Sequence, residues 1–242
     1  MLRLELFLPS PAEQLAADEA LLDWCEAGRG GELMLFWEPH GTFVVVGYAN
    51  KVTTEVNLAA CEENGVPIFR RCSGGGTVVQ MAGGLNYSLI LRIAETGPTR
   101  SISSANQFIM EKNRAAIQSA IGNRQSAISI RGHTDLCLGD LKFAGNSQRR
   151  RKHFLLFHGT LLLNCDLNLI SELLRMPTLQ PEYRASRAHG KFVTNLNLPA
   201  EKVKAALAQA WKANGEMPSP PLDEVKKLAR EKYSTREWNF KF

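Results

Sequence analysis

Residues 70–78 combine residue types that could hold an anion. They read RRCSGGGTV, with two arginines and three consecutive glycines between apolar segments. Without Cβ atoms, the glycines at 74–76 can adopt φ > 0 and turn main-chain N–H groups toward a phosphate or a carboxylate. Arg70 or Arg71 would add a planar, two-pronged donor. A flexible hairpin connection would explain the glycines alone, but the arginines and Ser73 favour anion binding. The segment matches neither a Walker loop nor a dinucleotide-binding fingerprint.

A lysine on a predicted strand at residues 141–146 is the second candidate. Because strand side chains alternate, we expect Lys142 and Ala144 on one face and Leu141 and Phe143 on the other. A surface lysine that protects an edge strand from aggregation is the alternative. The small Ala144 and Gly145 would let a ligand approach the backbone, which favours a lysine aimed at an anion.

His158 lies in a predicted strand at residues 154–164 and could act as a base or a metal ligand. No second histidine or carboxylate has metal-ligand spacing to it, so the sequence does not favour a histidine metal site. Ser73, His158 and Asp135 could compose a catalytic triad. Nothing in the sequence places Ser73 on a nucleophile elbow, so this interpretation is weak.

The composition is that of an ordinary globular protein, with 242 residues, 44% hydrophobic and 22% charged. No run approaches the roughly 18 to 20 apolar residues of a membrane span, and the first nine residues lack the apolar core of a secretion signal, so we expect a cytoplasmic protein without a membrane partner. Five scattered cysteines predict free thiols. The net charge of +5 suits nucleic acid, nucleotides or an acidic protein. The basic run 149–153 lacks interleaved aromatics, which disfavours nucleic acid.

The apolar pattern alternates between strands and helices without a steady βαβ repeat, which indicates an α+β fold with helices packed on a mixed sheet. Two strand pairs are expected as hairpins, 33–37 with 43–47 and 135–138 with 141–146, and residues 178–199 as an ordered loop. The other predicted strands are 66–69, 77–79, 85–93, 128–130 and 154–164, and the predicted helices are 10–28, 57–65, 103–121, 167–174, 200–214 and 222–232.

Three motifs in this order and spacing resemble the lipoate-protein ligase A family, within the biotin and lipoate ligase superfamily. The first is RRxSGGGTV at 70–78 followed by GLNYS at 84–88, the second is DxKFxGNSQR at 140–149, and the third is HGTLLL at 158–163. The resemblance covers about residues 10–240 of the sequence.

The resemblance implies a single catalytic domain over residues 1–242, with the large mixed sheet flanked by helices that biotin-lipoate ligases share with class II aminoacyl-tRNA synthetases. It also implies a two-step reaction. The carboxylate of lipoate attacks the α-phosphate of ATP, and a lysine of an apo lipoyl domain then attacks the acyl carbon of the lipoyl-adenylate. Mg²⁺ would accompany ATP and offset its charge.

Carried onto this sequence, the resemblance makes Lys142 the catalytic cation, because negative charge develops on the phosphate and the carbonyl oxygen in both steps. Asn86 would buttress the glycine loop, and Asp135 could contact the adenine or ribose. The full set expected to bind the substrate and the adenylate is Arg70, Arg71, Ser73, Gly74, Gly75, Gly76, Thr77, Asn86, Asp135, Ala144, Gly145, His158, Gly159 and Thr160.

The sequence departs from the family in lacking the C-terminal accessory domain, so either a separate chain supplies it or this branch works without it. The main alternative is an octanoyl or lipoyl transferase of the same fold, which takes the acyl group from a carrier protein through a cysteine thioester. Transferases of this kind keep the cysteine near what would be residues 127–130, where this sequence has none. A biotin ligase fits the motifs less well, and an idle scaffold or an RNA-binding domain would leave their register unexplained.

Overall fold

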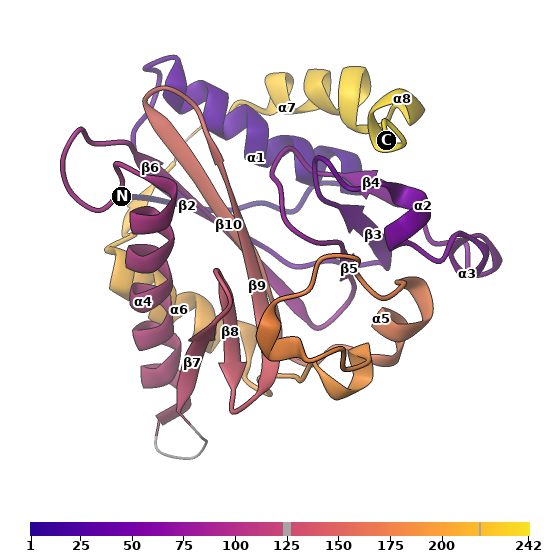
Figure 1. Cartoon of the computed structure of the whole chain (residues 1–242). Coiled ribbons are helices and arrows are strands. Elements are labelled where there is room, and N and C mark those ends of the chain that lie inside the picture. The colour runs from indigo at the N-terminus through magenta and orange to yellow at the C-terminus, as the bar shows by residue number, and fades with distance from the viewer. Residues whose placement is uncertain (123–126, 218) are drawn as a thin grey trace.

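A computed structural model describes residues 1–122, 127–217 and 219–242. Its centre is a mixed sheet of eight strands in the order β11-β1-β2-β6-β10-β9-β8-β7 (Figure 1). β1 runs parallel to β2 and β11, whereas β2, β6, β10, β9, β8 and β7 are successively antiparallel. The strand bounds are β1 (Leu2–Glu5), β2 (Leu33–Trp37), β6 (Gly84–Arg92), β7 (Ile128–Arg131), β8 (Asp135–Leu138), β9 (Leu141–Arg150), β10 (Phe154–Leu162) and β11 (Gly215–Glu216).

A second sheet has three strands, β4 (Ile68–Arg70), β3 (Phe43–Val46) and β5 (Val78–Gln80), with β3 in the centre. The predicted hairpin of residues 33–37 with 43–47 is therefore wrong, because β2 belongs to the large sheet and β3 to the small one. All four residues of β3 are buried. Burial on both faces is typical of a strand in the interior of a sheet. β3 is such a strand, and it pairs with β4 along one edge and with β5 along the other.

Helices cover both faces of the large sheet. On one face lie α4 (Ile102–Ile121) and α6 (Ala200–Trp211), which share one hydrophobic core with the sheet. On the other face lie α1 (Pro11–Glu26) and α7 (Leu222–Leu228), the latter continued by a π-helical turn, Ala229–Tyr233. The predicted start of α1 is confirmed, because the Ser10 side chain accepts from the N–H of Glu13.

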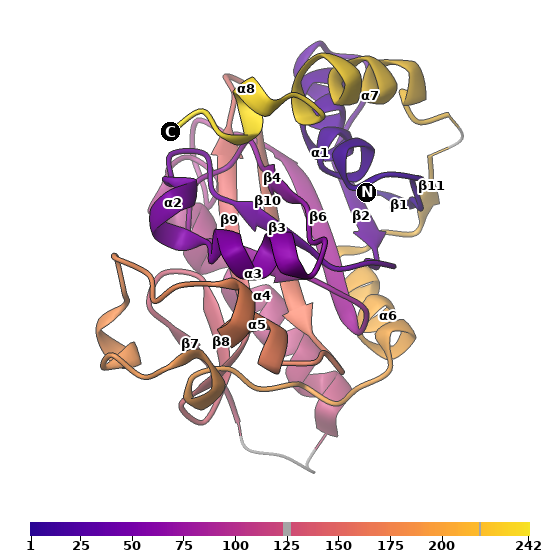
Figure 2. The ribbon, with the colours of Figure 1, turned by 90° about the vertical axis from the view of Figure 1, so that its right-hand side faces the viewer.

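The small sheet lies against the face of the large sheet that carries α1, and Figure 2 shows it with the short helices α2 (Val52–Glu55) and α3 (Leu58–Glu63) in front of the large sheet. Together with α5 (Asn168–Leu173) these elements form a third apolar core. The chain ends in α8 (Arg236–Asn239), which packs on β4. None of the helices in the described residues has the length and apolar character to cross a membrane.

Candidate active site

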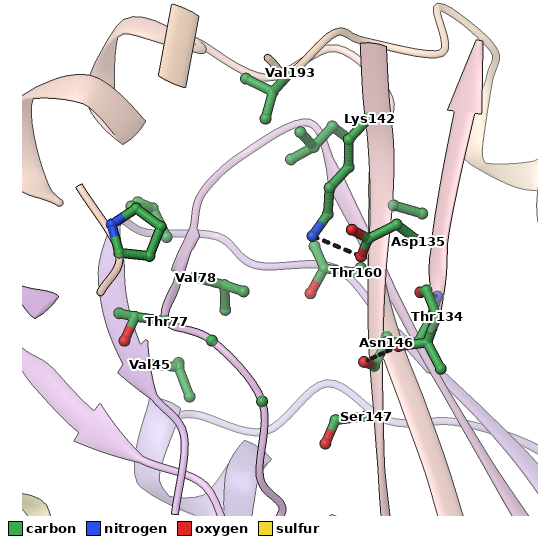
Figure 3. A pocket seen from close by; sticks show the side chains of 18 of the residues that line it. Val45, Thr77, Val78, Thr134, Asp135, Lys142, Asn146, Ser147, Thr160 and Val193 are labelled. Atoms are coloured by element: carbon green, nitrogen blue, oxygen red, sulfur yellow. Dashed lines mark hydrogen bonds and ion pairs between the residues drawn. The ribbon is translucent and has the colours of Figure 1, made fainter. Parts of the chain in front are cut away.

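A cavity of about 820 Å³ lies between the two sheets, and Figure 3 shows part of its wall. The glycine loop (residues 73–77) forms one side, and strands β9 and β10 form the other. Twelve of the residues singled out in the sequence line the cavity: Arg71, Gly75, Gly76, Thr77, Asn86, Asp135, Lys142, Ala144, Gly145, His158, Gly159 and Thr160. The three sequence motifs therefore converge on one pocket.

Side chains donate hydrogen bonds to the carbonyl groups of the glycine loop, and the N–H groups of the loop remain available to bind a ligand. Arg71 donates from one terminal nitrogen to the carbonyl oxygens of Gly74 (2.6 Å) and Gly76 (2.7 Å), and the Asn50 side chain donates to that of Gly75 (3.1 Å). Within the described chain, the N–H groups of Gly75, Gly76 and Thr77 meet no protein acceptor. Gly75 has φ +84°, which a side chain would disfavour. The loop can therefore present N–H donors to an anion.

The positive charge beside this loop comes from Arg71, which is buried and forms no ion pair with a carboxylate of the described residues. Burial lowers the pKa of its guanidinium to about 10, so that it remains charged at neutral pH. Its Nε donates to Ser73, one terminal nitrogen donates to the loop backbone, and the other terminal nitrogen donates to the carbonyl oxygen of Val45 at 3.4 Å. Arg71 thus shapes the loop, and its direct contact with the phosphate and acyl end, which the resemblance implies, stays a prediction.

Arg70 does not face the cavity, and its predicted role in anion binding is wrong. The side chain has no exposed surface, and it donates to the carbonyl oxygens of Gly47 (2.8 Å) and Asn239 (3.0 Å), among others. It joins β4 to the C-terminal helix. Ser73 and Gly74 are also outside the cavity wall: Ser73 is fully buried, and the exposed Gly74 takes part through its bound carbonyl group.

Lys142 projects into the cavity because β9 is irregular. Leu136 and Cys137 of β8 are consecutive but pair with Ala144 and Lys142, which leaves Phe143 as an extra residue. Such a β-bulge reverses the alternation of side chains. Phe143 and Ala144 both pack into the core, so the prediction that Lys142 and Ala144 share a face is wrong. The amine instead lies over Gly145, where an added Cβ would be 2.8 Å from Nζ.

Asp135 holds the amine of Lys142, with Oδ1 at 2.8 Å from Nζ (Figure 3). Its second oxygen accepts the hydroxyl of Tyr183 at 2.7 Å. Burial and the neighbouring carboxylate raise the pKa of Tyr183, so the hydroxyl stays a donor. The backbone of Lys142 is also held, because its N–H donates to Phe192 and its carbonyl accepts from Thr194. Asp135 is therefore a partner of the lysine, and an adenine or ribose contact stays a prediction.

His158 is bonded at both ring nitrogens. Its Nε2 lies 2.5 Å from Ser73 Oγ and its Nδ1 lies 2.6 Å from Asp18 Oδ2. The acid beside His158 is thus Asp18 of α1, and the composition of a triad with Asp135 is wrong, because Asp135 is bound to Lys142. Ser73 has no surface from which to attack a substrate.

A polar group on the cavity floor joins the two sheets. The side-chain amides of Gln80 and Asn86 bond each other at 2.9 and 2.8 Å, and Thr160 bonds both. Asn86 therefore supports the strand that follows the glycine loop. Beside this group the wall is apolar, with Leu15, Trp37, Val45 and Val78 in positions suited to an acyl chain.

A family model described as the lipoyl protein ligase A/B catalytic domain matches residues 10–212. The chain belongs to this family. The octanoyltransferase LipM of Geobacillus kaustophilus is 26% identical over 267 residues, covering 96% of this chain and 94% of that protein. The lipoate-protein ligase A subunit 1 of Thermoplasma acidophilum is 26% identical over 250 residues, covering 97% of this chain and 95% of that protein. The chain is thus an enzyme of the lipoate ligase and octanoyltransferase family.

Solved structures of lipoate-protein ligases share the fold. A putative lipoate protein ligase of T. acidophilum with bound lipoic acid aligns with a TM-score of 0.77 at 25% identity, over 99% of this chain and 98% of that one. A lipoate-protein ligase A with bound ATP aligns with a TM-score of 0.76 at 25% identity, over 99% of both chains. The α+β fold implied by the resemblance is confirmed.

Three residues of this site were missed in the sequence: Asp18, Gln80 and Tyr183. An acidic residue in the apolar pattern of α1 was a usable signal for Asp18, because a buried carboxylate needs partners. Tyr183 belongs to the segment 178–199, whose prediction as an ordered loop is confirmed by its 3₁₀ turns, Glu182–Arg184 and His189–Lys191. Its partner, Asp135, was not evident because the two residues are far apart in the sequence.

Proposed function

We propose that the chain is an ATP-dependent lipoate-protein ligase. The observation that carries the proposal is the pairing of a loop with free N–H groups and a lysine ammonium across one cavity. An acyl-phosphate anhydride needs these two kinds of group, since charge develops on its phosphate and on its carbonyl oxygen. The solved relatives with lipoic acid and with ATP support the same pair of substrates.

In the first step the carboxylate oxygen of lipoate attacks the α-phosphorus of ATP. A carboxylate–phosphorus bond forms, and the bond to the departing pyrophosphate breaks. The N–H groups of Gly75, Gly76 and Thr77 hold the phosphate, and the ammonium of Lys142 stabilises the added negative charge. Preorganised donors lose little free energy to reorientation at the moment of reaction, which is why they outperform water.

In the second step the amine of an acceptor lysine attacks the acyl carbon, the amide bond forms, and AMP leaves. The amine loses one proton in this step, which passes to the departing AMP or to water. Lys142 again stabilises negative charge, now on the carbonyl oxygen of the acyl group. Asp135 keeps the ammonium in place between the two steps, because it bonds Lys142 at one oxygen and Tyr183 at the other.

An octanoyltransferase is the second candidate, because relatives named octanoyltransferase LipM cover almost the whole chain. A thioester mechanism needs a reactive thiol in the cavity. All five cysteines lie within the part of the chain that the structure describes. They are buried, and none of them lines the cavity. Burial raises the pKa of the Cys72 thiol to about 12 and that of Cys165 to about 11, which opposes formation of a thiolate. These thiols favour the ligase.

We propose an apo lipoyl domain as the acceptor and residues 1–242 as one catalytic domain, aided by an accessory domain on a separate chain. The relative from T. acidophilum is named subunit 1 of its ligase, which supports a divided enzyme. The described residues offer no cluster of three metal-binding side chains. Mg²⁺ would therefore arrive on the phosphates of ATP.

The decisive experiment incubates purified protein and an apo lipoyl domain with lipoate and MgATP in one reaction, and with octanoyl-acyl carrier protein as the only acyl donor, without ATP, in a second. We expect a mass increase of the acceptor that requires ATP, with release of pyrophosphate. Modification from the carrier protein in the absence of ATP would establish the transferase instead. Addition of a candidate accessory chain tests whether transfer depends on it.

A further inference from the structure

A chain of buried hydrogen bonds connects α1 to the glycine loop. Ser88 donates to Asp18 Oδ1 at 2.6 Å, and Asp18 Oδ2 lies 2.6 Å from His158 Nδ1. His158 Nε2 lies 2.5 Å from Ser73 Oγ, and Arg71 Nε donates to the same oxygen at 3.1 Å. Asp18, Ser73 and Ser88 are almost completely buried. The chain spans two elements of the large sheet, one helix and the loop.

For a neutral imidazole, one arrangement of protons satisfies every member of this chain. The guanidinium of Arg71 can only donate, so Ser73 Oγ accepts from it. The carboxylate of Asp18 accepts from Ser88 and from His158, which places the imidazole proton on Nδ1. The other ring nitrogen is then free to accept the hydroxyl proton of Ser73. Each bond thereby has a fixed direction.

The same guanidinium binds the loop. Besides its bond to Ser73, Arg71 donates to the carbonyl oxygens of Gly74 and Gly76. A guanidinium is planar and moves as one rigid group. A bond at Nε therefore fixes the plane in which its terminal nitrogen meets the two carbonyls. Since a carbonyl and the following N–H belong to one peptide plane, the orientation of Arg71 also aims the N–H groups of Gly75 and Thr77.

We propose that His158 is a positioning residue for anion binding: through Ser73 and Arg71 it fixes the peptide planes of the glycine loop toward the phosphate of an acyl-adenylate. This inference rests on the proposed function, because it takes the anion to be that of the adenylate. A preoriented loop binds the anion more tightly than a loop that must reorganise. His158 is neither a base nor a partner of a nucleophile here, since both ring nitrogens are bonded and Ser73 is inaccessible.

The test is calorimetric titration with a non-reactive adenylate analogue, lipoyl-sulfamoyl-adenosine. Ser73→Ala and His158→Leu should each weaken its binding about tenfold, the size of one lost hydrogen bond to a charged group. The double variant should bind no more weakly than the worse single variant, because both substitutions break one chain. His158→Gln, which can present a carbonyl oxygen to Ser73, should restore part of the affinity.

Cys72→Ala is the matched control, because Cys72 is buried next to Ser73 and outside the chain. Its dissociation constant should stay within twofold of the wild-type value. If His158→Leu fails to fold, Ser73→Ala, which removes one oxygen, still decides. Wild-type protein that ignores the analogue would overturn both the proposed function and this inference. Tight binding by the wild type and equally tight binding by Ser73→Ala, or additive losses in the double variant, would overturn the inference alone.

Discussion

The amine of Lys142 points into the cavity because Phe143 is an extra residue in β9 and forms a β-bulge there. Lys142→Met keeps the length of the side chain and removes its charge, so it should lower the rate of lipoyl-adenylate formation by about 10² to 10³, as for the loss of one oxyanion donor. Pyrophosphate release measures this rate. Lys226→Met, on the exposed surface of α7, is the control and should have wild-type activity. An active Lys142→Met protein would remove the lysine from the chemistry.

Tyr183 offers a finer test of the same group. Tyr183→Phe keeps the ring that packs on Phe192, with centroids 5.3 Å apart, and removes only the hydroxyl that binds Asp135. Asp135 would then hold the ammonium less precisely, and we expect kcat for adenylate formation to fall about tenfold, with little change in KM for ATP. Initial rates over a range of ATP concentrations separate the two constants. A change confined to KM would argue against this positioning role.

At the residue scale the sequence predicted Lys142 and eleven other residues that line the cavity, because these positions combine chemistry-bearing side chains with small neighbours. It assigned Arg70 and Ser73 wrongly. Both are polar and lie beside the glycines, and the sequence does not show that they turn toward the protein interior. Asp18 was missed since its partner His158 comes from a strand 140 residues later.

Among the elements, the glycine loop depends on a close approach of the backbone at Gly47. A Cβ there would lie 2.1 Å from the carbonyl oxygen of Gly75, so the loop would have to shift. Gly47→Ala should therefore weaken binding of the adenylate analogue by tenfold or more, measured by calorimetry. Gly41→Ala, where an added Cβ meets nothing within 4 Å, should bind as the wild type does. Equal affinities for the two variants would contradict a rigid loop.

Most elements were predictable from apolar spacing and capping residues, including the β8–β9 turn at Gly139, which has φ +56°. Two features were not. The apolar run of β3 fits a hairpin with β2 as well as the centre of another sheet, and only tertiary packing decides. The bulge at Phe143 also leaves no local signal, although it determines which way Lys142 points.

At the scale of the whole molecule, Arg70 links segments that are far apart in the sequence. Its fully buried guanidinium bonds both the turn at residues 47–50 and the C-terminal helix α8. Its acceptors are backbone carbonyls, among them those of Gly47, Asn50 and Trp238, and a lysine cannot reproduce this planar set of donors. Arg70→Lys should therefore lower the free energy of unfolding by about 3 kcal/mol, measured by urea denaturation. The exposed Arg236→Lys should change it by less than about 0.5 kcal/mol.

The same variant separates a structural role from anion binding. Because Arg70 does not line the cavity, Arg70→Lys protein that is still folded at low temperature should keep its KM for ATP within about threefold. A direct contact with phosphate would instead raise KM strongly without loss of stability.

Since the turn that Arg70 binds also carries Gly47 and Asn50, which contact the glycine loop, partial unfolding of α8 should inactivate the enzyme before the large sheet unfolds. Activity measured along the urea titration should accordingly be lost ahead of the far-UV signal of the sheet.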